Sequence, residues 1–284
     1  IQEDETALVL YSLWQHYTIY HDVEFVAPHF RSLVTPAADF MVSYREPHTS
    51  LPEASYDLWE ERRGILSFTT AAVYAGLDAA ANFSMIFGEE ELMNKYRKAA
   101  QEIKDAALRY LWDEERGHFL RMINVDSNGN IQKDATLDSS LCGLFLFGMF
   151  SPRDTQIERT MQALEKTLWV KTEVGGMSRY ENDYYYQSTH DLSQAEGNPW
   201  FICTLWLAQY RISHANTLDE LHQALPLLEW VRTHALPSGV MAEQINPFTG
   251  APLSVSPLTW SHAEFVLTVR WYIGRYRKLV ENKG

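Results

Sequence analysis

The spacing of apolar residues along the chain predicts two kinds of helix. In the first kind apolar residues surround the helix, so every side of it must be covered. In the second kind they recur at helical spacing, as in Ile157, Met161 and Leu164, and one face is left to solvent. The first kind comprises residues 4–20, 64–87, 137–150, 198–214 and 259–275. The second kind comprises residues 23–44, 89–111, 154–169 and 218–234.

The order of these segments predicts a ring of helical hairpins. The covered helices begin about every 60 to 70 residues, which is typical of a repeated unit. An inner layer of covered helices inside an outer layer of amphipathic ones is an all-α toroid. We expect one domain over residues 1–284 that lacks its N-terminal part, because the chain opens on an inner helix and a ring of six hairpins needs about three more helices upstream.

Composition and charge narrow the class of partner. With 284 residues, of which 46% are hydrophobic, the chain can bury a large core. The 37 acidic and 24 basic side chains give a formal charge of -13, which argues against nucleic acid or an anionic membrane and favours a neutral or apolar ligand. The sequence contains neither a signal-peptide pattern nor an apolar run of bilayer length. We therefore expect no membrane partner and favour a cytoplasmic location.

Metal and redox chemistry find little support in the sequence. Cys142 and Cys203 each lie in an apolar stretch, which predicts buried thiols rather than a disulfide. The ten histidines have no metal-binding spacing, and His190 beside Asp191 is the only pair open to a catalytic interpretation. Residues 126–130 resemble a calcium loop but lack its glutamate, so they predict a plain turn. We expect no metal and no cofactor.

The chemically distinctive residues gather where the chain enters the covered helices. Antiparallel hairpins place these entries on one rim, and they are rich in carboxylates, Trp, Tyr and Arg, whereas the opposite turns are short. One entry carries Trp59, Glu60 and Glu61 directly before a predicted helix start. Apolar packing and a neighbouring charge suit a proton donor with a raised pKa. Acids at a helix N-terminus also favour the helix dipole, so the pattern alone leaves both interpretations open.

A second candidate carboxylate is Glu243, in the loop Ala242-Glu243-Gln244. Taken alone, it is an ordinary loop acid. Because Glu60 and Glu61 are neighbours in sequence, they are poor candidates for opposite faces of one sugar ring. Two carboxylates acting across a ring therefore need a second, distant loop, and Glu243 lies on the same predicted rim.

Three segments together resemble glycoside hydrolase family 15, the glucoamylases and the glucodextranases. Residues 56–61, Tyr-Asp-Leu-Trp-Glu-Glu, are similar to the family's general-acid signature. Residues 242–244 with 258–261, Ala-Glu-Gln and Leu-Thr-Trp-Ser, are similar to its general-base signature. Residues 178–185, followed by 197–201, look like its sugar-binding loop and the helix after it. The resemblance extends over nearly the whole chain.

The resemblance implies an (α/α)6 barrel that releases glucose with inverted configuration from the non-reducing ends of α-glucans. It identifies Glu60 as the proton donor and Glu243 as the base that activates water, with about 6.5 to 9.5 Å between the carboxyl groups of such an inverting pair. Arg179 and Asp183 resemble groups that hold the hydroxyls of the terminal glucose. The pocket would be completed by Asp4, Asp57, Trp59, Glu61 and Trp200.

The residues leave several alternatives open. Arg179 can instead form a structural ion pair with Glu181 or Asp183, and Trp59 and Trp200 can instead cap the core. The family's aromatic-Arg-Asp motif and the N-terminal β-sandwich of its bacterial and archaeal members are absent here. A trehalose or α-1,6-glucan hydrolase, a catalytically silent carbohydrate-binding barrel and pairing into a homo-oligomer therefore stay open.

Overall fold

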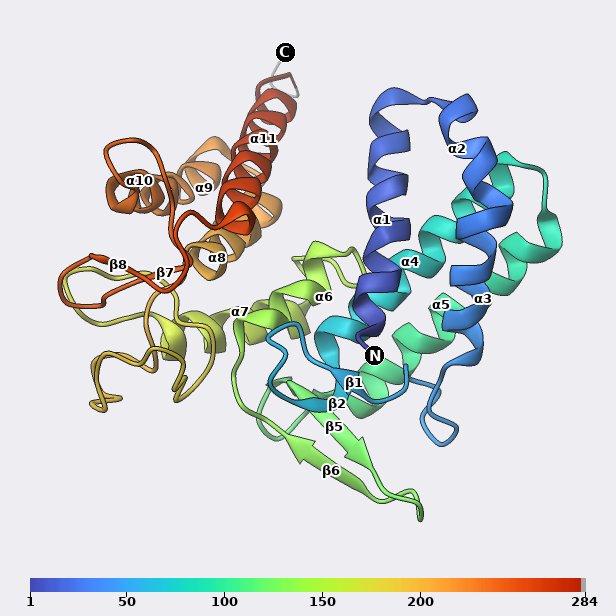
Figure 1. The fold of residues 1–284 in the computed structure, drawn as a ribbon, viewed down its shortest axis with the longest axis horizontal. Helices are drawn as coiled ribbons and strands as arrows, with labels where there is room; N and C mark the ends of the chain where they lie inside the picture. The colour runs from blue at the N-terminus through green and yellow to red at the C-terminus, as the bar shows by residue number, and fades with distance from the viewer. Residues whose placement is uncertain (282–284) are drawn as a thin grey trace. The chain divides into compact units, whose positions relative to one another are not determined.

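The computed structural model describes residues 1–281, and its regular structure is mainly helical (Figure 1). The chain divides into two compact units. The first unit contains residues 1–135 and 143–150, and the second contains residues 136–142 and those from 151 onward. That they form one catalytic domain stays a prediction, and each unit is described by itself below.

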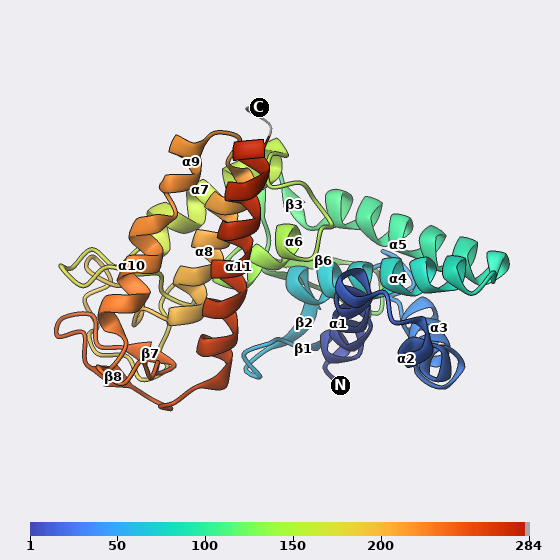
Figure 2. The same cartoon turned by 90° about the horizontal axis from the view of Figure 1, so that it is seen from above.

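The first unit is built around the buried helix α4 (Ser67–Ile86). This helix contacts α1 (Glu3–Tyr20), α3 (Thr35–Ser43), α5 (Glu90–Tyr110) and the short α6 (Gly143–Leu146), and its pairing with α5 is visible in Figure 2. Gly76 is required on α4 because an added Cβ would lie 3.0 Å from the backbone of Ala7 on α1. The absence of a side chain here lets the two helix backbones approach closely.

The predicted amphipathic helix at residues 23–44 is interrupted in the middle. It consists of α2 (Val23–His29), the π-helical turn η1 (Phe30–Val34) and α3. Pro28 lies inside α2 and a second proline follows at the start of α3. Proline lacks the backbone N–H that an α-helix uses and crowds the preceding turn, which explains the interruption.

Short antiparallel strands replace some of the expected helix in the first unit. One sheet has the order β1 (Ser55–Tyr56), β2 (Arg63–Leu66), β5 (Met122–Val125) and β6 (Ile131–Asp134), and a separate pair joins β3 (Trp112–Asp113) to β4 (His118–Phe119). The helix predicted from residue 64 therefore begins at residue 67. Residues 63–66 pair in extended form with β1 and β5, and cross-strand contacts override the local helical pattern.

The second unit is built around α8 (Phe201–His214). It also contains η2 (Ser139–Cys142), α7 (Thr155–Leu168), α9 (Leu218–His222), α10 (Leu225–His234), β7 (Gln244–Ile245), β8 (Pro252–Leu253) and α11 (Thr259–Glu281). Figure 2 shows α8 beside α10 and α11, and all three are in contact. The helix predicted at 218–234 is split into α9 and α10, with Pro226 in the first turn of α10, where its missing N–H costs nothing.

Two of the five helices predicted to be covered are buried along most of their length, namely α4 and α8. The prediction is wrong for α1 and α11 in the part of the chain that the structure describes, because α1 buries only its first turns and α11 buries only Ser261 and Thr268. Residues 137–150 were expected to form one helix but form η2 and the four-residue α6. A left-handed Gly148 and the Asp138 carboxylate, which accepts from the Ser140 N–H, shorten this segment.

Two smaller predictions, the buried thiols and the turn at residues 126–130, are confirmed. Cys142 and Cys203 are free, buried thiols. Residues 126–130 form a turn in which the Asp126 carboxylate accepts hydrogen bonds from the backbone N–H groups of residues 128 and 130. Within residues 1–281, no helix combines the length and the apolar content needed to cross a bilayer.

Candidate active site

Glu60 lies in the loop that joins β1 to β2 in the first unit. It was predicted to stand directly before a helix, but the strand β2 separates it from α4. Its φ of 59° is left-handed, and its N–H donates to the Asp57 carbonyl at 2.9 Å. This conformation is costly for a residue with a side chain, so a loop that maintains it must be held firmly. The Glu60 side chain is exposed.

Asp57 stabilises this conformation of the Glu60 loop. Its carboxylate is 1% exposed, and Oδ1 accepts from the backbone N–H groups of Glu61 at 2.7 Å and Arg62 at 3.1 Å. Its own N–H donates to the Arg62 carbonyl, which closes the loop. Oδ2 is buried with no hydrogen-bond partner within residues 1–281. Asp57 was predicted to line the sugar pocket. In the structure its carboxylate also stabilises the turn that carries Glu60.

Two further predicted pocket residues flank Glu60 in the same loop. The Trp59 side chain is 9% exposed, so most of its ring packs against protein. Glu61 forms an ion pair with Arg62 at 2.9 Å. The ion pair holds the Glu61 carboxylate beside Arg62 within this loop.

The first turn of α1 adds two buried carboxyl groups beside this loop. The Gln2 side-chain amide donates to the Asp57 carbonyl at 3.2 Å. Burial raises the pKa of Asp4 to about 6, and the nearby Asp57 charge contributes to this shift. Burial also raises the pKa of Glu3 to about 8, with contributions from Asp4 and Glu53. Both carboxylate oxygens of Glu3 lack a hydrogen-bond partner among the described residues.

Glu3 is the residue that sequence reasoning missed in this unit. It is the first residue of α1, and no motif in the sequence singles it out. Its acidic neighbours in sequence gave a weak signal, but its complete burial comes from contacts that residues distant in the chain supply. Carboxyl groups with strongly raised pKa values gather at functional sites in proteins, so the surroundings of Glu3 and Asp4 favour a working surface here.

In the second unit, Arg179 and Asp183 are paired with each other. The guanidinium donates through Nε to one carboxylate oxygen at 3.0 Å and through a terminal nitrogen to the other at 2.8 Å. Both side chains are buried, at 3% and 0% exposure. Of the two ion-pair partners considered for Arg179, the structure shows Asp183. A role of Arg179 in binding glucose stays a prediction.

Aromatic rings surround this pair. The Arg179 guanidinium carbon lies 4.6, 5.1 and 5.0 Å from the ring centres of Tyr180, Tyr185 and Trp200. Such contacts are attractive because the ring faces are electron-rich. Gly197 allows the loop to close on Asp183, since an added Cβ would lie 2.7 Å from the Asp183 Cβ. The charged fork is thus held rigidly at the start of α8.

Glu243 is attached to the same place by backbone and side-chain contacts. Trp200, the N-cap residue of α8, pairs as an isolated bridge with Gln244, and the Glu243 carbonyl accepts from the Phe201 N–H at 3.4 Å. The buried Gln244 oxygen accepts from the Asn198 side chain at 2.7 Å, and its amide donates to Glu243 Oε2 at 3.3 Å. The Glu243 side chain is half-buried.

The structure thus brings together the predicted residues within each unit. Asp4, Asp57, Trp59, Glu60 and Glu61 share one region of the first unit. Arg179, Asp183, Trp200 and Glu243 share one region of the second. Asn198 and Gln244, which connect Glu243 to the start of α8, were not assigned a role from the sequence because their importance depends on burial. The separation of Glu60 from Glu243 stays a prediction.

The remaining candidates do not gain support. His190 is exposed, and the Asp191 carboxylate accepts from Ser193 and Gln194. No group of three or more His, Cys, Asp or Glu side chains within residues 1–281 has the arrangement of a metal site.

Comparison with known proteins identifies the family. The chain matches the glycosyl hydrolases family 15 over residues 1–229 and 213–270. It is 31% identical over 281 residues to an uncharacterized glycosyl hydrolase of Methanocaldococcus jannaschii, covering 95% of this chain and 42% of that protein. Fold and sequence together define a glycoside hydrolase. The chain belongs to glycosyl hydrolase family 15.

Relatives with named activities are of two kinds. A glucoamylase of Clostridium sp. is 29% identical over 261 residues, covering 84% of this chain and 35% of the relative. A trehalase of Mycobacterium tuberculosis is 28% identical over 222 residues, covering 76% of this chain and 29% of the relative. A crystal structure of bacterial glucoamylase complexed with acarbose superposes with a TM-score of 0.78 at 25% identity, covering 97% of this chain and 41% of that one. The chain spans about two fifths or less of the length of these relatives.

Proposed function

We propose that this chain is the catalytic part of an inverting, exo-acting glucosidase that releases β-D-glucose from the non-reducing ends of α-glucans. The observation that supports this most strongly is that both candidate glutamates sit in loops fixed by buried polar groups. Asp57 holds the loop of Glu60, and Gln244 joins Glu243 to the start of α8. Acidic side chains that serve only as surface charges do not need buried polar groups to fix their position.

In this mechanism Glu60 donates its proton to the oxygen of the leaving sugar. Glu243 takes a proton from a water molecule, whose oxygen attacks the anomeric carbon from the opposite face. The two carboxyl groups must then stand about 6.5 to 9.5 Å apart, so that water fits between the base and the sugar. The bond to the leaving oxygen breaks as the new bond forms, and the released glucose has the inverted configuration.

Residues around each of the two glutamates are proposed to bind the sugar. Arg179 presents a planar donor fork that suits vicinal hydroxyls, and its pairing with Asp183 fixes the direction of that fork. Trp59 and Trp200 supply apolar surfaces for the C–H faces of a pyranose. The charge of Asp57 contributes to the raised pKa of Asp4, so the two carboxyl groups are near each other. Both are proposed to accept hydrogen bonds from further sugar hydroxyls. Bound acarbose in the bacterial glucoamylase supports an α-glucan-like ligand.

That this chain forms part of an (α/α)6 ring of helical hairpins belongs to the same proposal. Exposed apolar side chains on α1 and α11, among them Val9, Ile19, Val266 and Ile273, would be covered in a closed ring or by pairing of subunits. Sedimentation velocity over a range of protein concentrations separates these two cases, because only subunit pairing gives a mass that rises with concentration.

The direct test is hydrolysis of maltotetraose followed by proton NMR. The proposal expects β-glucose as the first product, before mutarotation. First appearance of α-glucose would overturn the inverting mechanism. Saturable binding without turnover would instead favour a catalytically silent carbohydrate-binding barrel.

Trehalose is the second candidate substrate, because trehalases of Mycobacterium tuberculosis and Mycolicibacterium smegmatis are among the relatives at 28% identity. Comparison of kcat/KM for maltotetraose, isomaltotriose and trehalose decides between α-1,4-glucan, α-1,6-glucan and trehalose hydrolysis. A clear preference for trehalose would replace the leading proposal without changing the roles of Glu60 and Glu243.

A further inference from the structure

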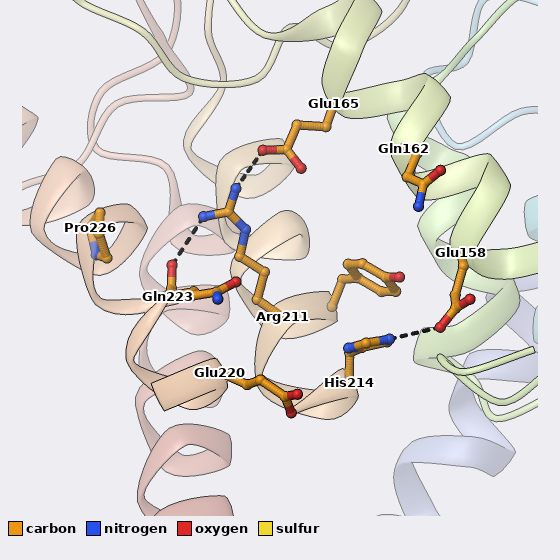
Figure 3. A pocket seen from close by; sticks show the side chains of 9 residues that line it. Glu158, Gln162, Glu165, Arg211, His214, Glu220, Gln223 and Pro226 are labelled. Atoms are coloured by element: carbon orange, nitrogen blue, oxygen red, sulfur yellow. Dashed lines mark hydrogen bonds and ion pairs between the residues drawn. The ribbon is translucent and has the colours of Figure 1, made fainter. Parts of the chain in front are cut away.

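A polar groove of about 720 Å³ lies in the second unit at the C-terminal end of α8. Three side chains each from α7, from α8 and from the segment spanning α9 and the start of α10 line it (Figure 3). None of them belongs to the candidate active site. Trp200 caps the opposite end of the 14-residue α8, and at 1.5 Å per residue the two ends are about 20 Å apart.

The charged side chains of this groove are already paired with protein groups. Glu158 forms a hydrogen bond with His214 at 2.8 Å, and Glu165 pairs with Arg211 (Figure 3). Glu220 lies 3.6 Å from Arg153 and also accepts from the backbone at the start of α9. A charged ligand would have to displace one of these internal partners. A neutral ligand leaves them in place, and the fixed carboxylates keep further lone pairs as acceptors.

Two amides complete the polar lining from opposite walls. The side chains of Gln162 on α7 and Gln223 after α9 are both among the groups that form the groove (Figure 3). Neither side chain has a hydrogen-bond partner in the described part of the chain, and each amide offers two donors and one acceptor. Tyr210 on α8 also lines the groove, and it is half-buried. Burial, together with Glu158 and Glu165, raises the pKa of Tyr210 to about 12, so its hydroxyl remains a donor.

The size and chemistry of the groove define a ligand class. Its volume falls in the range of about 300 to 1,000 Å³ that is usual for small-molecule sites. The combination of amides, fixed carboxylates, a guanidinium and one aromatic ring suits a ligand with many hydroxyl groups and some apolar C–H surface. We propose that this groove is a second, non-catalytic binding site for a neutral saccharide of the α-glucan class.

This site goes beyond the proposed catalytic function and can be tested independently of it. The probe is β-cyclodextrin, a cyclic α-1,4-glucan, because it has no non-reducing end and so cannot be a substrate of an exo-acting site. Isothermal titration calorimetry of the full chain with β-cyclodextrin is expected to show saturable binding below about 10 mM.

The variant that tests the location combines Gln162→Ala with Gln223→Ala. Loss of both amides is expected to weaken binding by about tenfold or more. Gln156→Ala on α7 is the matched control, since Gln156 is on the same helix but does not line the groove, and it should bind like the parent. Circular dichroism confirms that all three proteins are folded. Absence of binding in the parent, or equal binding in the parent and the double variant, overturns the proposal whatever the result with maltotetraose.

Discussion

The two candidate glutamates are held in place by different means. Glu60 is exposed in a loop of the first unit, and backbone hydrogen bonds and one buried carboxylate, that of Asp57, maintain its left-handed conformation. Glu243 is half-buried in the second unit, beside the side-chain network of Gln244 and Asn198. The first arrangement depends on a single side chain, whereas the second is spread over several packed groups.

This difference suits the two proposed roles. A proton donor must approach the leaving oxygen and exchange its proton with solvent between cycles, which an exposed loop permits. A base must hold one water molecule in a fixed direction, which a packed network favours. We therefore expect changes around Glu60 to alter mainly the rate, and changes around Glu243 and Arg179 to alter the stability as well.

The largest expected effect follows from removing either carboxylate. Glu60→Gln and Glu243→Gln are each expected to lower kcat for maltotetraose by about 10² to 10⁴-fold, because each removes one proton transfer. Glu173→Gln, a change of an exposed acid in the second unit, is the matched control and should leave kcat unchanged. A Glu60→Gln or Glu243→Gln enzyme within tenfold of the parent would contradict the assignment.

A large loss of stability is expected when the buried ion pair of the second unit is broken. Arg179→Ala leaves the Asp183 carboxylate buried without its cation, which typically costs about 3 to 5 kcal/mol. Urea denaturation measures this loss. The double variant Arg179→Met with Asp183→Leu removes both charges and should recover part of the stability but none of the activity. If Arg179→Ala is as stable as the parent, the pair does not support the site.

The buried Glu3 predicts a stability difference that depends on pH. Folding raises its pKa from 4.5 to about 8, so the folded state holds a proton that the unfolded state releases. The unfavourable contribution is absent below pH 4.5, grows between 4.5 and 8, and is complete above 8. Glu3→Gln should therefore stabilise the protein on the order of 5 kcal/mol at high pH and have little effect at low pH.

The measurement for Glu3 is the free energy of unfolding of parent and Glu3→Gln across this pH range. Glu24→Gln, a change of an exposed acid on α2, serves as control and should give no pH-dependent difference. A gain for Glu3→Gln that is the same at every pH would indicate a packing effect and not the release of a buried proton.

The smallest of these effects is expected for Asp57→Asn. The amide keeps the shape and can accept from one N–H, but it loses the charge that strengthens both loop hydrogen bonds, at a cost of about 1 to 2 kcal/mol. In line with the comparison above, kcat should fall more than tenfold while the KM changes little, because the Glu60 loop loosens. A rise in KM with unchanged kcat would show that Asp57 acts on binding alone.

Two of the four helices with an amphipathic pattern could be predicted closely from the sequence. The segment predicted at 89–111 is α5 at Glu90–Tyr110, and that at 154–169 is α7 at Thr155–Leu168. Their apolar stripe alone specifies which face is covered. Apolar content without such a stripe was less informative, since it predicted one helix at 137–150 and missed the strand at 63–66.

In the candidate site, too, some features are specified by local sequence and others only by the tertiary structure. The sequence by itself determined which chemical groups are present and their order: Glu60 beside Trp59, Arg179 ahead of Asp183, and Glu243 next to Gln244. These are properties of short segments, and they were enough for the family. Only the tertiary structure decided that Asp57 fixes the Glu60 loop, that Arg179 is paired with Asp183, and that Glu3 is buried with a raised pKa. Burial, desolvation and hydrogen-bond partners are supplied by residues far away in the chain, so no local pattern can specify them.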